Sequence, residues 1–112
     1  MLPRQHRLGS QGAKFTIKRG KGLSGPFLRI KGVPSKGQHT QATVVVGLSV
    51  SKLATARNRI KRRVREILRP RLPKIQPAVN FMVFAGKGAE KRTFQELKTE
   101  LDALLRRAGL IP

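Results

Sequence analysis

One short segment of this chain constrains its fold more than any other, because it combines an apolar stripe with dense positive charge. Residues 57–69 read RNRIKRRVREILR, which is six Arg, one Lys and one Glu. Apolar residues recur at helical spacing here and just before it: Ala56, Ile60, Val64, Ile67 and Leu68. This stripe predicts an amphipathic helix that packs on a sheet. Leu53 falls on the same stripe, so we expect the helix to start just after Ser51, a good N-cap, and to stop at Pro70.

The charged side of this helix has three interpretations. Asn58, Arg62, Arg65 and Arg69 cluster opposite the stripe, and like charges one turn apart repel. A solvated face is one interpretation, and a helix lying on a membrane surface is another. Nucleic-acid binding fits best, because the apolar face is needed for the sheet and Arg pairs bidentately with phosphate and stacks on bases.

The charge of the whole chain favours the same partner. The 112 residues contain 25 Lys and Arg against 5 Asp and Glu, a net charge of +20, and residues 1–65 hold 16 of the basic residues and no acid. Such an imbalance opposes compaction through self-repulsion, which a polyanion would relieve. Nucleic-acid phosphates are the first candidates and anionic membranes the second. The partner surface is expected in the first two-thirds of the chain.

The length and composition predict one domain, residues 1–112, in the cytoplasm. Cysteine is absent, which excludes disulfides and thiolate metal sites. The N-terminus lacks the apolar region of a signal peptide, and no apolar run reaches transmembrane length. We therefore expect a soluble protein with no membrane partner.

Three segments have strand patterns: 27–31, 42–51 and 80–85. In the first, Leu28 and Ile30 share one face, and Phe27, Arg29 and Lys31 the other. In the second, the core row is Val44, Val46, Leu48 and Val50. The opposite row is mostly small: Thr43, Val45, Gly47, Ser49 and Ser51. Small side chains there leave room for something to lie on the sheet, although the pattern is also that of a strand with a mixed outer face.

The remaining segments complete an α+β fold. We expect an irregular arm at 1–12, a short helix at 13–19, a flexible loop at 20–25, turns at 32–41 and 86–88, and a linker at 70–79. Thr93 and Glu96 form a capping-box pattern that opens a helix closing near Gly109. Its apolar face is Phe94, Leu97, Leu101, Leu104 and Leu105. This order predicts helices packed on a sheet of about four strands.

Residues suited to catalysis are not grouped in this sequence. The first 65 residues contain no carboxylate, so an acid pair or a metal cluster cannot form there. Glu96 and Glu100, one turn apart, are interpreted as a solvated helix face, and His6 and His39 as surface residues in loops. We expect no catalytic residue and no protein-held metal, so any chemistry would come from another component.

Residues 46–52 and 57–69 together carry a specific family resemblance. VGLSVSK at 46–52, followed closely by the segment at 57–69, resembles the bacterial ribonuclease P protein component, whose signature helix reads RNR-x-KR-x-x-RE-x-x-R. Weaker likenesses lie at 25–28 (GPFL), 81–89 (FMVFAGKGA) and 104–110 (LLRRAGL). The resemblance implies a mixed sheet packed with helices and a left-handed β-α-β crossover. It also implies the protein subunit of an endoribonuclease whose RNA subunit catalyses Mg²⁺-dependent removal of the 5′ leader from precursor tRNA.

The resemblance also implies which residues bind RNA, and we infer no obligate protein partner. Contacts with the catalytic RNA would come from Arg57, Asn58, Arg59, Lys61 and Arg62. Lys52 would meet a phosphate, and Arg65 would face the RNA or the leader. A cleft between the first helix and the sheet would hold the leader against Phe15, Ile17, Phe27 and Arg29, with Phe15 stacking on a base. The alternative for Phe15 is that it anchors its short helix to the core.

The chain departs from the family pattern in two places. Only LATA separates Lys52 from Arg57, so the usual Gly-containing turn before the helix is missing. The stretch from Phe15 to Gly20 is also short and lacks a second aromatic residue, whose place Ile17 would take. The alternative function is a small basic ribosomal protein, which would share the size, charge and mixed fold. A transcriptional regulator is disfavoured because no helix-turn-helix pairing is evident.

Overall fold

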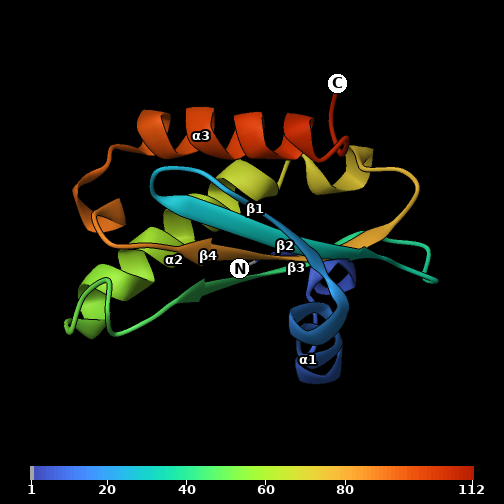
Figure 1. The fold of residues 1–112 in the computed structure, drawn as a ribbon, viewed down its shortest axis with the longest axis horizontal. Coiled ribbons are helices and arrows are strands. Elements are labelled where there is room, and N and C mark those ends of the chain that lie inside the picture. The colour runs from blue at the N-terminus through green and yellow to red at the C-terminus, as the bar shows by residue number, and fades with distance from the viewer. Residues whose placement is uncertain (1) are drawn as a thin grey trace.

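The computed structural model describes residues 2–112, which form a four-stranded sheet with helices on both faces (Figure 1). The helices are α1 (Ser10–Arg19), α2 (Ala54–Leu68) and α3 (Phe94–Arg107). The strands are β1 (Lys21–Ser24), β2 (Leu28–Pro34), β3 (Gln41–Val46) and β4 (Val79–Ala85). Short 3-10 helices lie at η1 (Arg4–His6), η2 (Leu72–Lys74) and η3 (Ala89–Lys91). The α+β prediction is confirmed.

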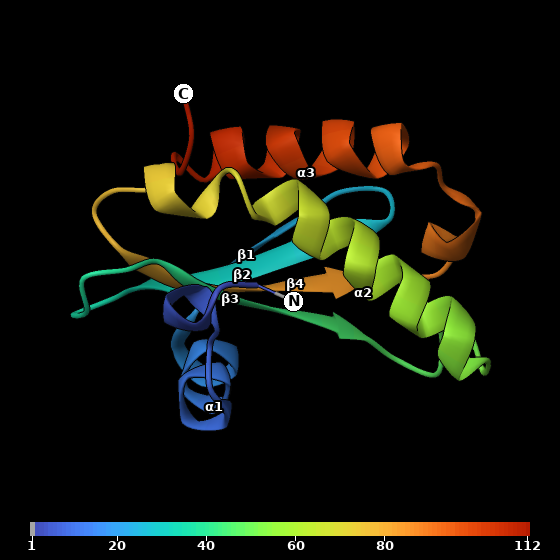
Figure 2. The ribbon, with the colours of Figure 1, turned by 180° about the vertical axis from the view of Figure 1, so that it is seen from behind.

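The sheet is mixed, with strand order β1-β2-β4-β3. β1, β2 and β4 pair antiparallel, whereas β3 and β4 are parallel neighbours joined through α2. In Figure 2, β3 and β4 run in the same direction, β3 lies nearer the viewer, and α2 returns above the sheet. This arrangement is a left-handed crossover, as the family resemblance implied and against the usual right-handed preference.

The core lies between the sheet and two helices. α2 and α3 cover one face of the sheet, while α1 packs against β2 and β4 on the other face (Figures 1 and 2). Strand register places Ile30, Val83 and Val44 side by side on the α2 and α3 face. The predicted apolar stripe of α2 is buried throughout: Ala56, Ile60, Val64, Ile67 and Leu68. Burying this stripe leaves the basic side of α2 on the surface.

The N-terminal segment is more ordered than the irregular arm that we expected. Arg7 forms a parallel bridge with Ala42, so this segment covers the outer edge of β3. The ring of His6 is buried, and its Nδ1 lies 2.7 Å from the carbonyl oxygen of Thr40. The prediction of a surface His6 is therefore wrong, because an edge strand needs backbone partners and this segment supplies them. His39 is exposed, as expected.

The segment between β3 and α2 also differs from the prediction. β3 ends at Val46, and a turn follows in which the Val50 N–H donates to the Gly47 carbonyl at 3.1 Å. This turn interrupts the strand alternation, so Leu48 is 68% exposed instead of lying in the core row, whereas Val50 is buried as predicted. Leu53, not Ser51, is the N-cap of α2, and its side chain is 67% exposed.

Two other segments were wrongly assigned from the sequence. The expected flexible loop at 20–25 contains β1, because its backbone pairs with β2 through partners such as Lys21 and Gly32. β2 itself continues to Pro34, into the stretch predicted to be turns. Long-range backbone pairing, which a local pattern does not show, decides both cases.

The C-terminal helix is largely as predicted. Thr93 Oγ1 accepts the Glu96 N–H at 3.1 Å, and Glu96 Oε1 accepts the Thr93 N–H at 3.0 Å, so the capping box is confirmed. Its leucines are buried, but Phe94 is exposed. Glu100 is not a purely solvated residue, since its carboxylate accepts backbone hydrogen bonds from the start of β2. Within residues 2–112, no helix is long and apolar enough to cross a membrane.

Candidate nucleic-acid interface

α2 presents the first basic surface. Asn58, Arg59 and Arg62 are exposed, and Lys61 is half-buried beside them. Glu66, the one acid of this helix, is held by Arg69 at 3.1 Å. The helix therefore carries more positive charge than its own acid neutralises, which is the electrostatic pattern of a phosphate-binding surface.

Two arginines at the margins of this surface also hold the fold together. Arg57 Nη1 donates to the Ser51 carbonyl at 2.8 Å, which closes the short loop in front of α2. Arg63 Nη1 donates to the Arg92 carbonyl at 3.0 Å, which ties α2 to the segment before α3. A guanidinium has five N–H donors, so Arg57 keeps donors for a phosphate while making this bond. Replacing Arg57 therefore has a structural cost that replacing the exposed Arg59 lacks.

Two further cations predicted to bind RNA lie at the ends of this surface. Lys52 is exposed in the loop that precedes α2. Arg65 lies at the other end, where it lines a pocket of about 180 Å³ with Arg7 and Thr43 beside the covered edge of β3. The structure thus spreads the predicted RNA contacts along the whole length of α2.

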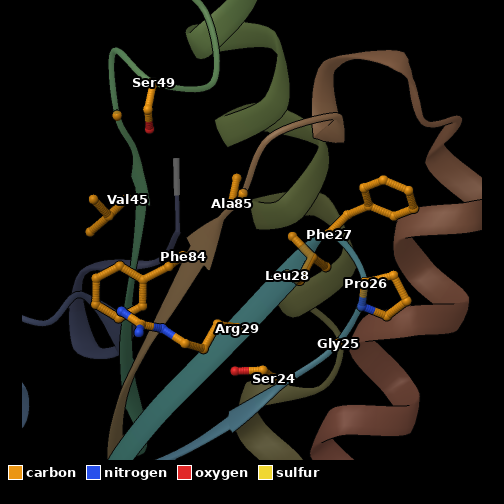
Figure 3. A pocket seen from close by; sticks show the side chains of 12 residues that line it. Ser24, Gly25, Pro26, Phe27, Leu28, Arg29, Val45, Ser49, Phe84 and Ala85 are labelled. Atoms are coloured by element: carbon orange, nitrogen blue, oxygen red, sulfur yellow. The ribbon is translucent and has the colours of Figure 1, made fainter.

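The second candidate surface is on the opposite face of the sheet. Register places Val45, Phe84 and Arg29 in one row across β3, β4 and β2. The Arg29 guanidinium lies 4.7 Å from the centre of the Phe84 ring, a cation–π contact (Figure 3). This row borders a pocket of about 390 Å³, which is also lined by Gly47, Ser49 and the turn between β1 and β2. Of the small outer row predicted for this strand, Val45, Gly47 and Ser49 line the pocket, the last two from the turn that follows β3.

α1 lies on this same face of the sheet. Its one buried side chain is Thr16, and Lys31 Nζ donates to the Ile17 carbonyl. Phe15 and Ile17 are 57% and 50% exposed, so Phe15 does not anchor the helix in the core. Neither side chain lines the pocket beside Arg29 and Phe84, so α1 provides a separate exposed apolar site.

The ring of Phe27 lies apart from Arg29, although Phe27 borders the same pocket. It points away from Phe84, toward α3 (Figure 3), and the Arg92 guanidinium lies 4.6 Å from its centre. A Cβ at Gly88 would come within 2.8 Å of this ring. The expectation that Phe27 shares a face with Arg29 is wrong, because β2 begins at Leu28 and strand alternation does not extend to Phe27.

The sequence model of the family described as Ribonuclease P matches residues 2–109. The chain belongs to the ribonuclease P protein family. It is 33% identical to the ribonuclease P protein component of a Synechococcus strain, over 99% of this chain and 87% of that one. The corresponding protein of a Pseudanabaena strain is 35% identical, over 99% and 97% of the two chains.

Solved ribonuclease P proteins have the same fold. The Staphylococcus aureus RNase P protein superposes with a TM-score of 0.86 at 21% identity, covering 96% of this chain and 98% of that one. The Thermotoga maritima RNase P protein gives 0.79 at 25% identity, covering 90% and 96%. These likenesses confirm the fold that the signature helix predicted, and they do not support the alternative of a ribosomal protein.

One member of this ribonuclease P protein's candidate interface was missed in the sequence. Phe84 was assigned only to a strand, although alternation along NFMVFA places it and Met82 opposite Phe81 and Val83. Its role depends on strand register, which places Phe84 beside Arg29 so that the guanidinium stacks on the ring; we call this pair the Arg29–Phe84 platform. Among residues 2–112, no group of three or more His, Asp or Glu side chains is placed to hold a metal ion.

Proposed function

We propose that this chain is the protein subunit of ribonuclease P, and that it binds the catalytic RNA along α2 and the 5′ leader of precursor tRNA on the opposite face of the sheet. The observation that carries the proposal is that α2 and the Arg29–Phe84 row lie on opposite faces of one sheet. Two RNA segments can therefore bind at once without competing for the same side chains.

The α2 surface suits a folded RNA. The exposed guanidinium groups of Arg59 and Arg62 can each donate two parallel hydrogen bonds to one phosphate. The Asn58 amide can both donate and accept at a base edge or a 2′-hydroxyl. Each neutralised phosphate releases counterions, so binding here would depend steeply on salt.

The opposite face suits a single strand. Arg29 over Phe84 combines a cation for the backbone with an aromatic ring for a base, and exposed Phe15 on α1 offers a second ring. Stacking tolerates any base, which is what a protein that meets many leader sequences needs. Mature tRNA has no leader, so this face would distinguish precursor from product.

The chemistry of cleavage is assigned to the RNA subunit. Two observations support this: no three His, Asp or Glu side chains of residues 2–112 are grouped for a metal ion, and four of the five acids have protein partners, namely Glu66, Glu96, Glu100 and Asp102. We therefore propose that RNA donors hold the Mg²⁺, while this chain neutralises phosphate charge and orients the leader. Cleavage of precursor tRNA by this complex would take place in the cytoplasm.

The test is reconstitution with a bacterial ribonuclease P RNA and a 5′-labelled precursor tRNA. We expect the RNA alone to need more Mg²⁺ than the RNA with this protein, and protein freed of RNA by nuclease treatment to cleave nothing. A matched control is the Phe94→Ala protein, which should lower the Mg²⁺ requirement as the wild type does. Cleavage by the RNA-free protein, or an unchanged Mg²⁺ requirement, would overturn the proposal.

A further inference from the structure

We propose that Glu100 of α3 is a positioning residue for the leader-binding pocket, acting through the turn at residues 24–28 that forms one wall of that pocket. The inference rests on the proposed function, since it concerns how the pocket is shaped for the leader. Glu100 does not line the pocket beside Arg29 and Phe84. It reaches the turn from the helix layer on the other face of the sheet.

The carboxylate of Glu100 caps the backbone of this turn. Its Oε2 accepts the Phe27 N–H at 2.9 Å and also accepts the Leu28 N–H. Two charge-assisted bonds to one oxygen hold both amides in fixed positions. Because Leu28 begins β2, the carboxylate sets the point at which the strand enters the sheet.

Two backbone bonds complete the clamp. The Gly25 N–H donates to the Leu28 carbonyl, and the Gly86 N–H donates to the Phe27 carbonyl, each at 2.7 Å. The turn is thus bonded to itself, to the end of β4 and to α3. Two side chains of α3 take part, since Arg107 Nη1 also donates to the Ser24 carbonyl at 3.4 Å. Glu100 makes the two shorter bonds, so its removal is the sharper test of the clamp.

Gly25 leaves room for this carboxylate because it has no side chain. A Cβ at Gly25 would lie 2.6 Å from Glu100 Oε2 and 3.0 Å from Cδ, closer than such atoms approach. The glycine has an ordinary φ, so its role is to leave space for the carboxylate. Any larger residue at position 25 would displace either the turn or Glu100.

The consequence for the leader follows from the next residue along the chain. Arg29 comes directly after the clamped Leu28 amide, and its guanidinium stacks on Phe84. The turn and Arg29 together supply half of the pocket's lining: Ser24, Gly25, Pro26, Phe27, Leu28 and Arg29. Figure 3 shows this segment between α3 and the Phe84 ring. Loosening the turn would therefore widen the pocket and release the Arg29–Phe84 platform.

The experiment measures the affinity of the reconstituted holoenzyme for precursor and for mature tRNA. We expect Glu100→Ala to weaken precursor binding roughly tenfold and to leave mature tRNA unchanged, because two amides lose their acceptor and the platform loosens. Glu100→Gln should restore most of the affinity, since an amide oxygen can accept the same two N–H groups. Glu96→Ala, one turn away on the exposed side of α3, is the matched control and should not alter the ratio of the two affinities.

A double-mutant cycle tests the contact itself. Gly25→Ala should reproduce the loss of Glu100→Ala, and the double variant should be no worse than Glu100→Ala, because removing the carboxylate makes room for the new methyl group. Additive losses, or equal losses for both tRNAs accompanied by a lower melting temperature, would overturn the positioning role. A wild-type holoenzyme that does not prefer precursor would instead refute the proposed function, whereas a preference that Glu100→Ala retains would refute this inference alone.

Discussion

Replacing Phe15 by alanine separates leader binding from stability. Phe15 lies on α1 with 57% of its surface exposed, and the buried contact of that helix is made by Thr16 instead. Truncating a side chain that is mostly in water removes little packing, so surface substitutions of this kind usually change stability by about 0.5 kcal/mol or less. We therefore expect Phe15→Ala to fold and melt like the wild type.

The expected loss of binding is much larger than the loss of stability. A base stacked on an aromatic side chain contributes about 1–3 kcal/mol, which corresponds to a roughly 5- to 150-fold weaker affinity for precursor tRNA. The affinity for mature tRNA should be unchanged, because only the precursor carries the stacked strand. The difference between the two substrates isolates the stacking contribution from general phosphate attraction.

The assay is a binding titration of the holoenzyme with both tRNAs, together with a thermal melt of the free protein. Phe94→Ala is the matched control, because it also removes a phenyl ring from an exposed position. Phe94 is 42% exposed and lies on α3, on the other side of the sheet from α1. This substitution should leave both affinities unchanged. Equal losses for the two tRNAs, or a leader effect as large in Phe94→Ala, would refute the assignment of Phe15 to the leader.

Three further predictions concern charge. Arg59→Ala should lower the slope of log affinity against log salt for the RNA subunit by about 0.7–0.9 without changing the melting temperature, whereas Arg57→Ala should also lower that temperature because a backbone carbonyl loses its donor. Arg71→Ala breaks a paired contact with Asp102, whose side chain is 14% exposed, and should reduce the free energy of unfolding by about 1.5–3 kcal/mol in a denaturant titration. Hydrogen bonds from the N-cap residue of α3, its backbone N–H first, lower the pKa of Glu96 below 4.5. The stability that ionised Glu96 contributes is therefore present above pH 4.5 and is lost as the pH falls through the lowered pKa of the folded state. The melting temperatures of the wild type and Glu96→Gln should therefore converge in acid.

The features that the sequence predicted correctly are those with a local period or a local motif. The apolar stripe of α2 and the Thr93 capping box depend on residues three or four apart, which any helix brings together. The basic surface of α2 followed from the same period, since burying Ile60 and Val64 leaves Arg59 and Arg62 exposed. The signature of this helix also identified the family, and with it the left-handed crossover, which general rules of topology would have predicted wrongly.

The tertiary structure decided whatever depends on residues distant in the sequence. A turn at Gly47 exposed Leu48, which continued alternation would have buried, and pairing with β2 made a strand of an expected loop. Register brought Phe84 beside Arg29, and Glu100 capped the backbone of Phe27, 73 residues away. No local period contains these pairings, because they depend on which strands pair, in which register, and on which backbone donors the sheet leaves for a side chain. The sequence determined that this chain would present a basic helix, and the fold determined which side chains meet on the face behind it.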